Sequence, residues 1–158
     1  MYYHLILTDN CNLCCTYCRG KAFTVDPPEL PDITVDEDLP VDLDIDLSDL
    51  YRFLAKDPDA VLTFYGGEPL LAADRIREIV RDAPVSALIL HTNGTLLDRL
   101  EPRVANRFDT ILVSIDGPEA LTDAHRGEGT FGLITKNLRN LVAGGFAGEL
   151  IARMTVTE

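Results

Sequence analysis

The stretch CNLCCTYC, from Cys11 to Cys18, holds all four cysteines of this chain. Cys11, Cys15 and Cys18 are spaced C-x3-C-x2-C, and Tyr17 stands just before the last of them. The apolar run 2–8 reads as a strand that leads into this cysteine loop. Thiolates this dense favour one compact metal centre that prefers sulfur ligands. An iron–sulfur cluster held by three protein thiolates would keep its fourth iron free, and an open coordination position distinguishes a catalytic metal site from a closed structural one.

Three other interpretations of these cysteines are open, and each fits the residues less well. A zinc site normally joins two separated Cys pairs, whereas Cys11/Cys14 and Cys15/Cys18 abut. Disulfides need an oxidising compartment, and the chain opens without a secretory signal. The i, i+4, i+7 spacing could also bury the cysteines on one helix face, although their neighbours are polar. The residues favour a cluster, with zinc as the main alternative.

The chain as a whole reads as a single globular domain. Its 158 residues can bury a real core, and a composition of 46% apolar and 25% charged residues is ordinary for such a domain. No apolar run approaches membrane-spanning length, so we expect no membrane partner. The net charge of −12, without a basic cluster, argues against a nucleic-acid partner.

Acidic residues concentrate in a Pro-rich stretch, the acidic loop 24–47. Residues 26–49 hold ten acidic side chains and neither Lys nor Arg. Such a run is usually a solvated face, and the sharper alternative is a lip that attracts a basic substrate segment. Prolines and like charges disfavour compact structure, so we expect residues 26–47 to be the most mobile internal segment and peripheral to the cysteines.

After this loop a unit repeats: apolar strand, short loop, amphipathic helix. The run 41–47 alternates apolar and Asp residues and could be an edge strand, or it could lead straight into a helix capped by Asp46 or Ser48. Pro102 is expected to kink or split a later helix. Further strands are predicted at 61–65, 87–91, 110–115 and 150–156, and helices around 50–56, 76–80, 96–104 and 131–142. Since right-handed crossovers return the chain in the same direction, the sequence predicts an α/β fold with about five parallel strands and crossover helices, as a partial β/α barrel or an open sheet.

Polar and glycine-rich turns follow these strands with some regularity. The carboxyl ends of parallel strands meet at one rim, where α/β proteins place their sites. The cysteine loop follows the first strand, and the next three are followed by Gly66-Gly67-Glu68-Pro69, Thr92-Asn93-Gly94 and Ser114-Ile115-Asp116-Gly117. We therefore expect one pocket around the metal centre.

The first of these turns could bind a cation. Gly66 and Gly67 would let the backbone approach a ligand closely, so that its carbonyls accept from an ammonium group, and Glu68 would add a carboxylate for the same cation. The alternative is a tight turn entering a helix, with Pro69 at the first helical position.

The other two turns also have structural alternatives. Thr92 and Asn93 could line a pocket, yet Asn-Gly is simply good turn chemistry. Ser114 and Asp116 suit ribose hydroxyls or a carboxylate, yet Asp-Gly-Pro is also a plain turn. Three histidines lack metal-ligand spacing and are expected to be structural or exposed: His4, His91 and His125.

The cysteine spacing, with its aromatic residue before the third cysteine, resembles the signature of the radical S-adenosylmethionine (SAM) superfamily. The resemblance implies that Cys11, Cys15 and Cys18 ligate a [4Fe-4S] cluster, that Cys14 is a spacer, and that SAM chelates the fourth iron through its amino and carboxylate groups. It also implies that the GGEP turn holds the SAM amino group and that TNG belongs to the SAM pocket. The implied cofactor-binding residues are Tyr17, Gly66, Gly67, Glu68, Pro69, Thr92, Asn93, Ser114, Asp116 and Arg126.

The stretch 114–131, SIDGPEALTDAHRGEGTF, is similar to its equivalent in anaerobic sulfatase-maturing and related peptide-modifying members. There the serine and an arginine twelve positions on contact SAM, which implies Ser114 and Arg126 here; the arginine fork would suit the methionyl carboxylate. Thr122 stands where histidine is common in that group. The opening run 2–23 looks most like archaeal peptide-modifying members of the SPASM type.

The resemblance covers nearly the whole chain and implies a radical SAM core domain over residues 1–158. Such proteins usually continue through a sixth strand into a cysteine-rich SPASM domain with further clusters, and this sequence has neither. It is therefore expected to be an N-terminal piece that holds a cluster and SAM without completing a substrate reaction.

The implied activity is reductive cleavage of SAM to a 5′-deoxyadenosyl radical, which abstracts hydrogen from a peptide or protein substrate. The implied partners are that substrate and an electron donor such as ferredoxin or flavodoxin, in the cytoplasm. Two alternatives remain open: a radical SAM enzyme acting on a small molecule or cofactor precursor, and a non-catalytic metal-binding fragment.

Overall fold

The computed structural model describes residues 1–18 and 40–156. Most of the acidic loop 24–47, with the prediction about its mobility, lies outside the described residues. The described elements are, in chain order, β1 (Tyr2–Ile6), α2 (Leu47–Leu54), β2 (Val61–Tyr65), a 3₁₀ turn (Pro69–Ala72), α3 (Ala73–Asp82), β3 (Ala87–Thr92), a second 3₁₀ turn (Leu97–Arg99), α4 (Pro102–Ala105), β4 (Thr110–Ser114), α5 (Glu119–Arg126), α6 (Thr130–Ala143) and β5 (Glu149–Arg153).

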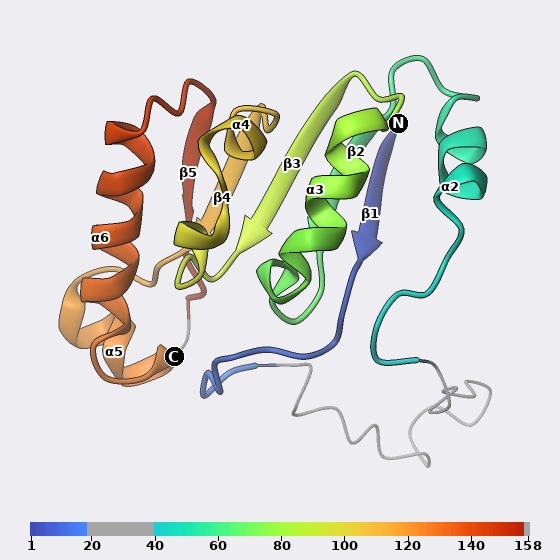
Figure 1. Ribbon diagram of the computed structural model, residues 1–158. Coiled ribbons are helices and arrows are strands. Elements are labelled where there is room, and N and C mark those ends of the chain that lie inside the picture. Colours follow the sequence, from blue (N-terminus) through green and yellow to red (C-terminus); the bar gives the residue numbers. More distant parts are fainter. Residues whose placement is uncertain (19–39, 157–158) are drawn as a thin grey trace, which may run out of the picture.

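Five parallel strands form one open sheet in the order β1-β2-β3-β4-β5 (Figure 1). Neighbours in the sheet are neighbours in the chain, because each crossover returns the chain one strand over in the same direction. The register places His4 opposite Thr63, Thr63 opposite Ile89, and Leu112 opposite Ile151. The predicted fold, a partial β/α barrel of about five parallel strands, is confirmed.

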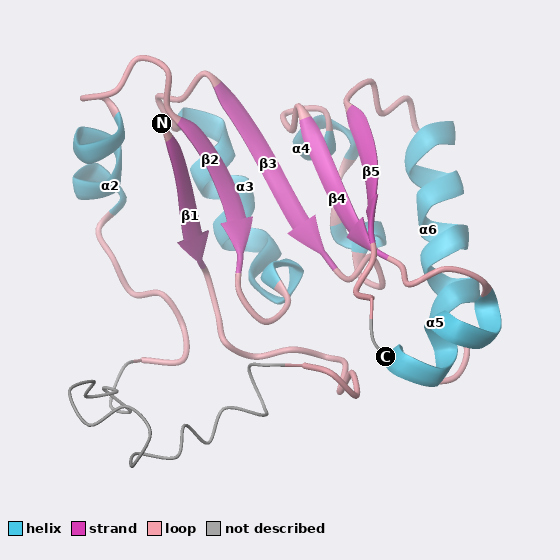
Figure 2. Cartoon of the chain, turned by 180° about the vertical axis from the view of Figure 1, so that it is seen from behind, coloured by secondary structure: helices cyan, strands magenta, loops and turns pink. Residues whose placement is uncertain are grey.

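Helices α3, α4 and α6 cover one face of this sheet (Figures 1 and 2). The side chains that β2, β3 and β4 send to that face are almost fully buried: Leu62, Phe64, Leu88, Leu90, Ile111 and Val113. Burying a large apolar side chain contributes about 1.5–3 kcal/mol, so this layer holds the helices to the sheet. The opposite face is not covered by any helix of the described part of the chain.

The segment 41–47 leads into α2 rather than forming an edge strand. An isolated antiparallel bridge joins Asp42 to Thr8, and the Thr8 hydroxyl donates to the Asp42 carboxylate over 2.6 Å. The Asp46 side chain then caps α2 by accepting from the Ser48 amide over 2.8 Å. Of the two alternatives for this segment, the structure shows the second.

The helical region around 96–104 is split, as expected from Pro102. A 3₁₀ turn is followed by α4, and Pro102 stands at the first position of α4, where its missing N–H costs nothing. Helix α5 was not predicted, because its buried residues are Thr122 and Arg126 rather than an apolar stripe. Among the described helices, none has the length and apolar character needed to cross a membrane.

Candidate functional site

The cysteine loop runs along the carboxyl ends of the strands, below their arrowheads in Figure 1. The segment leading into it is bonded to the turn after β2. The Gly67 amide donates to the Thr8 carbonyl, and the Glu68 amide donates to the Asn10 carbonyl, each over 2.8 Å. The GGEP turn and the cysteine loop therefore meet directly, as the strand-end pattern predicts.

Gly66 and Gly67 are needed for this contact. A Cβ at Gly66 would overlap the Thr8 carbonyl oxygen, and one at Gly67 would overlap the carbonyl oxygens of Asp9 and Asn10. These obstacles are backbone atoms that cannot rotate away, and the φ of +136° at Gly66 also favours glycine. The two glycines let the incoming chain pack on the turn, while their expected contact with a ligand ammonium stays a prediction.

The Glu68 carboxylate is fully buried and accepts three hydrogen bonds. Its Oε1 accepts from the Leu70 amide at 3.0 Å and from the Thr92 hydroxyl at 2.7 Å. Its Oε2 accepts from the Asn93 amide at 2.7 Å. Burial raises the pKa of Glu68 above its ordinary value, and the three donors oppose that rise. This carboxylate links the turns after β2 and β3, so the protein already uses the oxygens that were expected to meet a ligand cation.

Asn12 docks the cysteine loop onto the turn after β3. The Asn93 side-chain amide donates to Asn12 Oδ1 at 2.9 Å, and Asn12 Nδ2 donates to the Thr95 hydroxyl at 2.8 Å. Asn93 Nδ2 also lies 3.8 Å from Cys11 Sγ, within reach of a weak N–H···S contact. From α6, buried Asn137 donates to two carbonyls of the same turn at 3.1 and 2.9 Å. The turn is thus held from both sides.

A buried ion pair contacts the end of the cysteine loop. The side chains of Arg126 on α5 and Asp116 after β4 are 6% and 0% exposed. Arg126 donates through Nε to Asp116 Oδ2 at 2.8 Å and through Nη2 to Oδ1 at 3.1 Å. The Tyr17 hydroxyl donates to the same Oδ2 at 2.5 Å, and the guanidinium carbon lies 5.6 Å from the centre of the Tyr17 ring. We call these three residues the clamp.

The clamp residues control one another's ionisation. Burial alone would raise the pKa of Asp116, but hydrogen bonds from Arg126 and Tyr17 hold it below its ordinary value. Burial, together with the hydrogen bond to Asp116, raises the pKa of Tyr17 to about 12, so the hydroxyl keeps its proton. The Arg126 nitrogens Nε and Nη2 bind Asp116 in this structure. The contact of Arg126 with a SAM carboxylate, which the resemblance implies, stays a prediction.

Residues outside the predicted set of cofactor-binding residues support the clamp. The hydroxyl of fully buried Thr122 accepts from the Asp116 amide at 3.2 Å, and the Thr155 amide beyond β5 donates to Asp116 Oδ1 at 3.1 Å. The His125 carbonyl accepts from the Thr16 amide at 3.0 Å. Thr122 offered one signal, since it stands where the resembled group commonly has histidine; the other contacts depend on tertiary packing alone.

The three predicted cluster ligands are free thiols within the eight-residue loop. Burial raises the pKa of the Cys15 thiol, and the neighbouring Cys11 and Cys18 add to the rise. Among the residues that the structure describes, no three His, Cys, Asp or Glu side chains already stand in metal-binding geometry. The donor set, three thiols with an amide donor near one sulfur, fits an iron–sulfur cluster. Binding would draw the sulfurs together, as is usual for a site completed by its metal.

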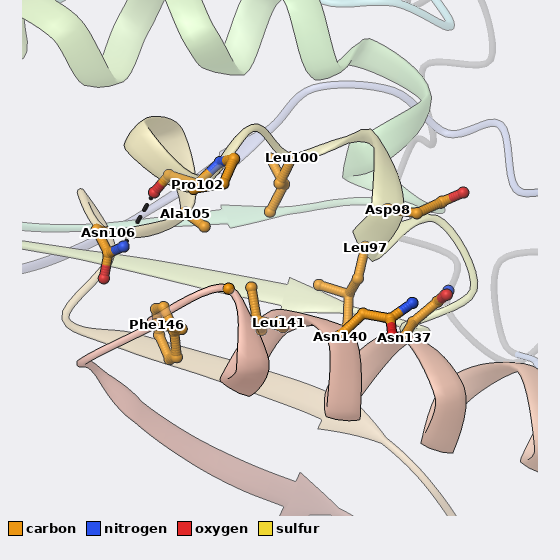
Figure 3. Close-up of a pocket in the computed structure, with 11 residues that line it drawn as sticks. Leu97, Asp98, Leu100, Pro102, Ala105, Asn106, Asn137, Asn140, Leu141 and Phe146 are labelled. Atoms are coloured by element: carbon orange, nitrogen blue, oxygen red, sulfur yellow. Dashed lines mark hydrogen bonds between the residues drawn. The ribbon is translucent and has the colours of Figure 1, made fainter.

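Two hollows in the described structure differ in chemistry. One of about 260 Å³ lies between α4 and α6 (Figure 3) and is lined by apolar and amide side chains, with Asp98 as its one ionisable residue. The other, of about 620 Å³, lies on the face of the sheet opposite the helices, where its lining includes Tyr65, His91 and Arg153. His91 was expected to be structural or exposed, and Arg153 was not singled out. The second hollow reaches the carboxyl ends of the strands through Ile6, Tyr65 and Arg153. A further hollow, of about 450 Å³, is lined by Thr8 and Asn10 in the segment that leads into the cysteine loop.

Comparisons with known proteins identify the family of this chain. The model of the Radical SAM superfamily matches residues 5–157. The chain is 31% identical over 154 residues to the mycofactocin maturase MftC of Mycobacterium tuberculosis (strain H37Rv), and 36% identical over 162 residues to the pre-heme d1 synthase of Dinoroseobacter shibae. These alignments cover 92% and 96% of this chain and 35% of each relative, so the chain spans about a third of the length of these curated relatives.

Solved structures show the same fold. Native anSMEcpe with bound AdoMet, which is SAM, superposes with a TM-score of 0.65 at 21% identity, over 96% of this chain and 42% of that chain. The same protein with AdoMet and the Cp18Cys peptide gives a TM-score of 0.61 at 20% identity, over 94% and 42%. The superfamily uses a [4Fe-4S] cluster and SAM, the cofactors that the cysteine spacing indicates. Since the family model matches nearly the whole sequence and curated relatives exceed 30% identity, this chain belongs to the radical SAM superfamily.

Proposed function

We propose that this chain is the part of a radical SAM enzyme that binds the cluster and SAM, with Cys11, Cys15 and Cys18 as the cluster ligands. When bound, the cluster and SAM supply reductive cleavage to a 5′-deoxyadenosyl radical that abstracts hydrogen from a substrate. The chain itself is proposed to position the thiols and to line the SAM pocket.

One observation carries this proposal: the cysteine loop and the segment leading into it are bonded to the ends of three neighbouring strands at once. Backbone bonds to Gly67 and Glu68 attach it to β2, Asn12 attaches it to β3, and Tyr17 attaches it to β4. A loop held at three points presents its thiols at a defined place on the rim. A closed zinc site would order its loop through its own four ligands and gives no reason for these contacts.

Within the site, we divide the predicted cofactor-binding residues into two groups. The turn residues around the cysteine loop are proposed to contact SAM, as the resemblance implies: Tyr17, Gly66, Gly67, Pro69, Thr92, Asn93 and Ser114. Glu68, Asp116 and Arg126 are proposed to hold those turns in place, because their charged groups are buried and bonded within the protein. A buried charged network of this kind fixes the geometry that a cofactor meets.

For the substrate, we propose a peptide or protein. Two points support this: the resemblance of 114–131 to peptide-modifying members, and the capture of the Cp18Cys peptide by anSMEcpe, which shares the fold. A small molecule is the second candidate, favoured by the 36% identity to a pre-heme d1 synthase. The electron is proposed to come from a donor such as ferredoxin or flavodoxin.

The test is anaerobic reconstitution with iron and sulfide, followed by addition of SAM and dithionite. Mass spectrometry should detect 5′-deoxyadenosine from the wild type and from Cys14→Ala, the matched control that loses a thiol outside the ligand set. Cys15→Ala should give only background. Background levels from a wild-type chain that carries a full cluster would refute the catalytic proposal, and zinc in place of iron would favour the non-catalytic alternative.

A further inference from the structure

The open face of the sheet carries an unpaired guanidinium at its carboxyl edge. Arg153, the last residue of β5, lines the 620 Å³ hollow. Its Nη1 lies 2.9 Å from His91 Nε2. No ion pair among the described residues includes Arg153, and its Nε and Nη2 have no protein partner there. In buried Arg126, by contrast, the same two atoms, Nε and Nη2, donate hydrogen bonds to Asp116.

His91 orients this guanidinium without neutralising it. Burial, then the nearby positive charges of Arg153 and Arg126, lowers the pKa of His91 to about 4. A neutral ring that accepts at Nε2 carries its proton on Nδ1. The Tyr65 ring lies 4.9 Å from the His91 ring at 36°, which limits its movement. Nη1 is therefore held by a neutral acceptor, and the Nε/Nη2 edge of Arg153 stays available.

The remaining walls of the hollow carry no acidic group. Besides the His4 imidazole, they are apolar, aromatic or hydroxyl side chains, including Tyr2, Ile6, Thr63, Ile89 and Leu112. The acidic residue on the same face of β5, Glu149, is four positions from Arg153, about 13 Å along the strand, and its carboxylate accepts from Thr110. A cation at the rim of a neutral hollow suits a ligand with one anionic group and an apolar body.

We propose that Arg153, oriented by His91, is a carboxylate-binding subsite for a ligand whose carboxylate is joined to an apolar or aromatic body. The free Nε/Nη2 edge matches a carboxylate in bidentate geometry, and the apolar walls would cover the rest of the ligand. This inference rests on the proposed function in one respect, that ligands meet this face near the cysteine loop.

Two carboxylates could come to this subsite. One is the methionyl carboxylate of SAM, since the Arg126 edge that the resemblance assigns to it is bound to Asp116 in this structure. The other belongs to the substrate, as at a peptide C-terminus or on an acidic side chain. Both present the same chemistry to Arg153, so the experiment has one arm for each.

The first arm uses the three histidines as reporters. His4 and His91 line the hollow, whereas His125 lies against Tyr17, with ring centres 5.4 Å apart. The chain labelled with ¹⁵N-histidine is titrated with N-acetyl-L-tyrosine and with N-acetyl-L-tyrosinamide, which has the same body without the carboxylate. We expect the acid to shift the His91 and His4 signals but not those of His125, and to bind at least about tenfold more tightly than the amide, since a charged hydrogen-bonded contact contributes about 1.5–3 kcal/mol.

The second arm compares SAM with decarboxylated SAM by calorimetry on the reconstituted chain. Arg153→Gln is the test variant in both arms, and exposed Arg139 on α6 supplies the matched control, Arg139→Gln. Loss of the acid-over-amide preference in Arg153→Gln assigns the subsite to a substrate carboxylate. Loss of the SAM-over-decarboxylated-SAM preference assigns it to SAM.

The subsite is refuted if neither preference depends on Arg153, or if the wild type shows no carboxylate preference in either arm. The first arm needs no cluster and is run before and after reconstitution. A failed subsite can therefore be told from a failed function: the chain may still form 5′-deoxyadenosine without a carboxylate preference, or show the preference without cleaving SAM.

Discussion

The Tyr17 hydroxyl lies 2.5 Å from Oδ2 of Asp116, 99 residues further along the chain. The same carboxylate binds Arg126 through both of its oxygens. One buried acid therefore joins the cysteine loop to the end of β4 and to α5. Since Tyr17 is next to Cys18 in the chain, the position of the thiols depends on an ion pair buried inside the protein.

Tyr17→Phe removes the hydroxyl and keeps the ring. A hydrogen bond to a charged group contributes about 1.5–3 kcal/mol, so the loop should open more often and Cys15 and Cys18 of the cluster-free chain should react about tenfold faster with iodoacetamide. Mass spectrometry of each labelled cysteine gives the rates. Exposed Cys14 is the internal control and should keep its rate. An unchanged rate at Cys15 would contradict the clamp.

Asp116→Asn leaves Arg126 buried without its counter-charge. Breaking a buried pair in this way typically lowers the free energy of unfolding by about 3–5 kcal/mol, to be measured by urea denaturation. The control is Asp98→Asn at an exposed position, which should change the free energy of unfolding by less than about 0.5 kcal/mol.

This loss should depend on pH with a definite sign. The folded-state pKa of Asp116 is lowered, so its stabilising effect is present above about pH 4, the ordinary value for Asp, and is lost as the pH falls through the folded-state pKa. The difference in the free energy of unfolding between wild type and Asp116→Asn should therefore become smaller as the pH is lowered. A difference that becomes larger in acid would contradict this account of the ion pair.

Glu68→Gln replaces a carboxylate oxygen that accepts hydrogen bonds with an amide group that donates them. One of the three donors, the Leu70 amide, the Thr92 hydroxyl or the Asn93 amide, would then face another donor. We expect the free energy of unfolding to fall by about 1–3 kcal/mol, measured in the same way. Glu119→Gln, at an exposed position on α5, is the matched control. Equal stability of the two variants would show that Glu68 is not needed to hold the turn after β3.

The His91 ring should stay neutral down to about pH 4, well below the ordinary value of 6.5. Between these two pH values His91 is protonated in the unfolded chain but neutral in the folded chain. The free energy of unfolding should therefore decrease as the pH falls through this window. Titration of the ¹⁵N-histidine signals measures the pKa directly. In Arg153→Gln the pKa of His91 should rise, because one nearby positive charge is gone. A wild-type midpoint near 6.5 would contradict the described environment of this ring.

Much of the fold could be predicted from the sequence, because it depends on local patterns. The apolar runs and the intervening helical periods predict five parallel strands, and their order in the sheet follows from the crossover rule. The cysteine spacing and the GGEP turn predict the rim that the structure shows. Helix α5 escaped prediction, because it buries polar Thr122 and Arg126 instead of an apolar stripe.

The partners of the polar side chains could not be predicted, because they depend on tertiary contacts. Whether the Arg126 fork faces a ligand or Asp116 is decided by where α5 packs, and the sequence does not reveal this. His91 on β3 and Arg153 on β5 are 62 residues apart in the sequence. Their side chains meet across β4, the strand between them in the sheet. Sequence patterns therefore predict where the candidate site lies, whereas the contacts of individual charged groups have to come from the structure.

The central claim is that Cys11, Cys15 and Cys18 together hold one iron–sulfur cluster. Its most direct test is the iron and sulfide content of the four single Cys→Ala variants after anaerobic reconstitution, with the visible iron–sulfur absorbance measured alongside. We predict a full [4Fe-4S] complement in wild type and in Cys14→Ala, and loss of the cluster in Cys11→Ala, Cys15→Ala and Cys18→Ala. Loss of the cluster in Cys14→Ala, or its full retention in any of the other three, would contradict the claim.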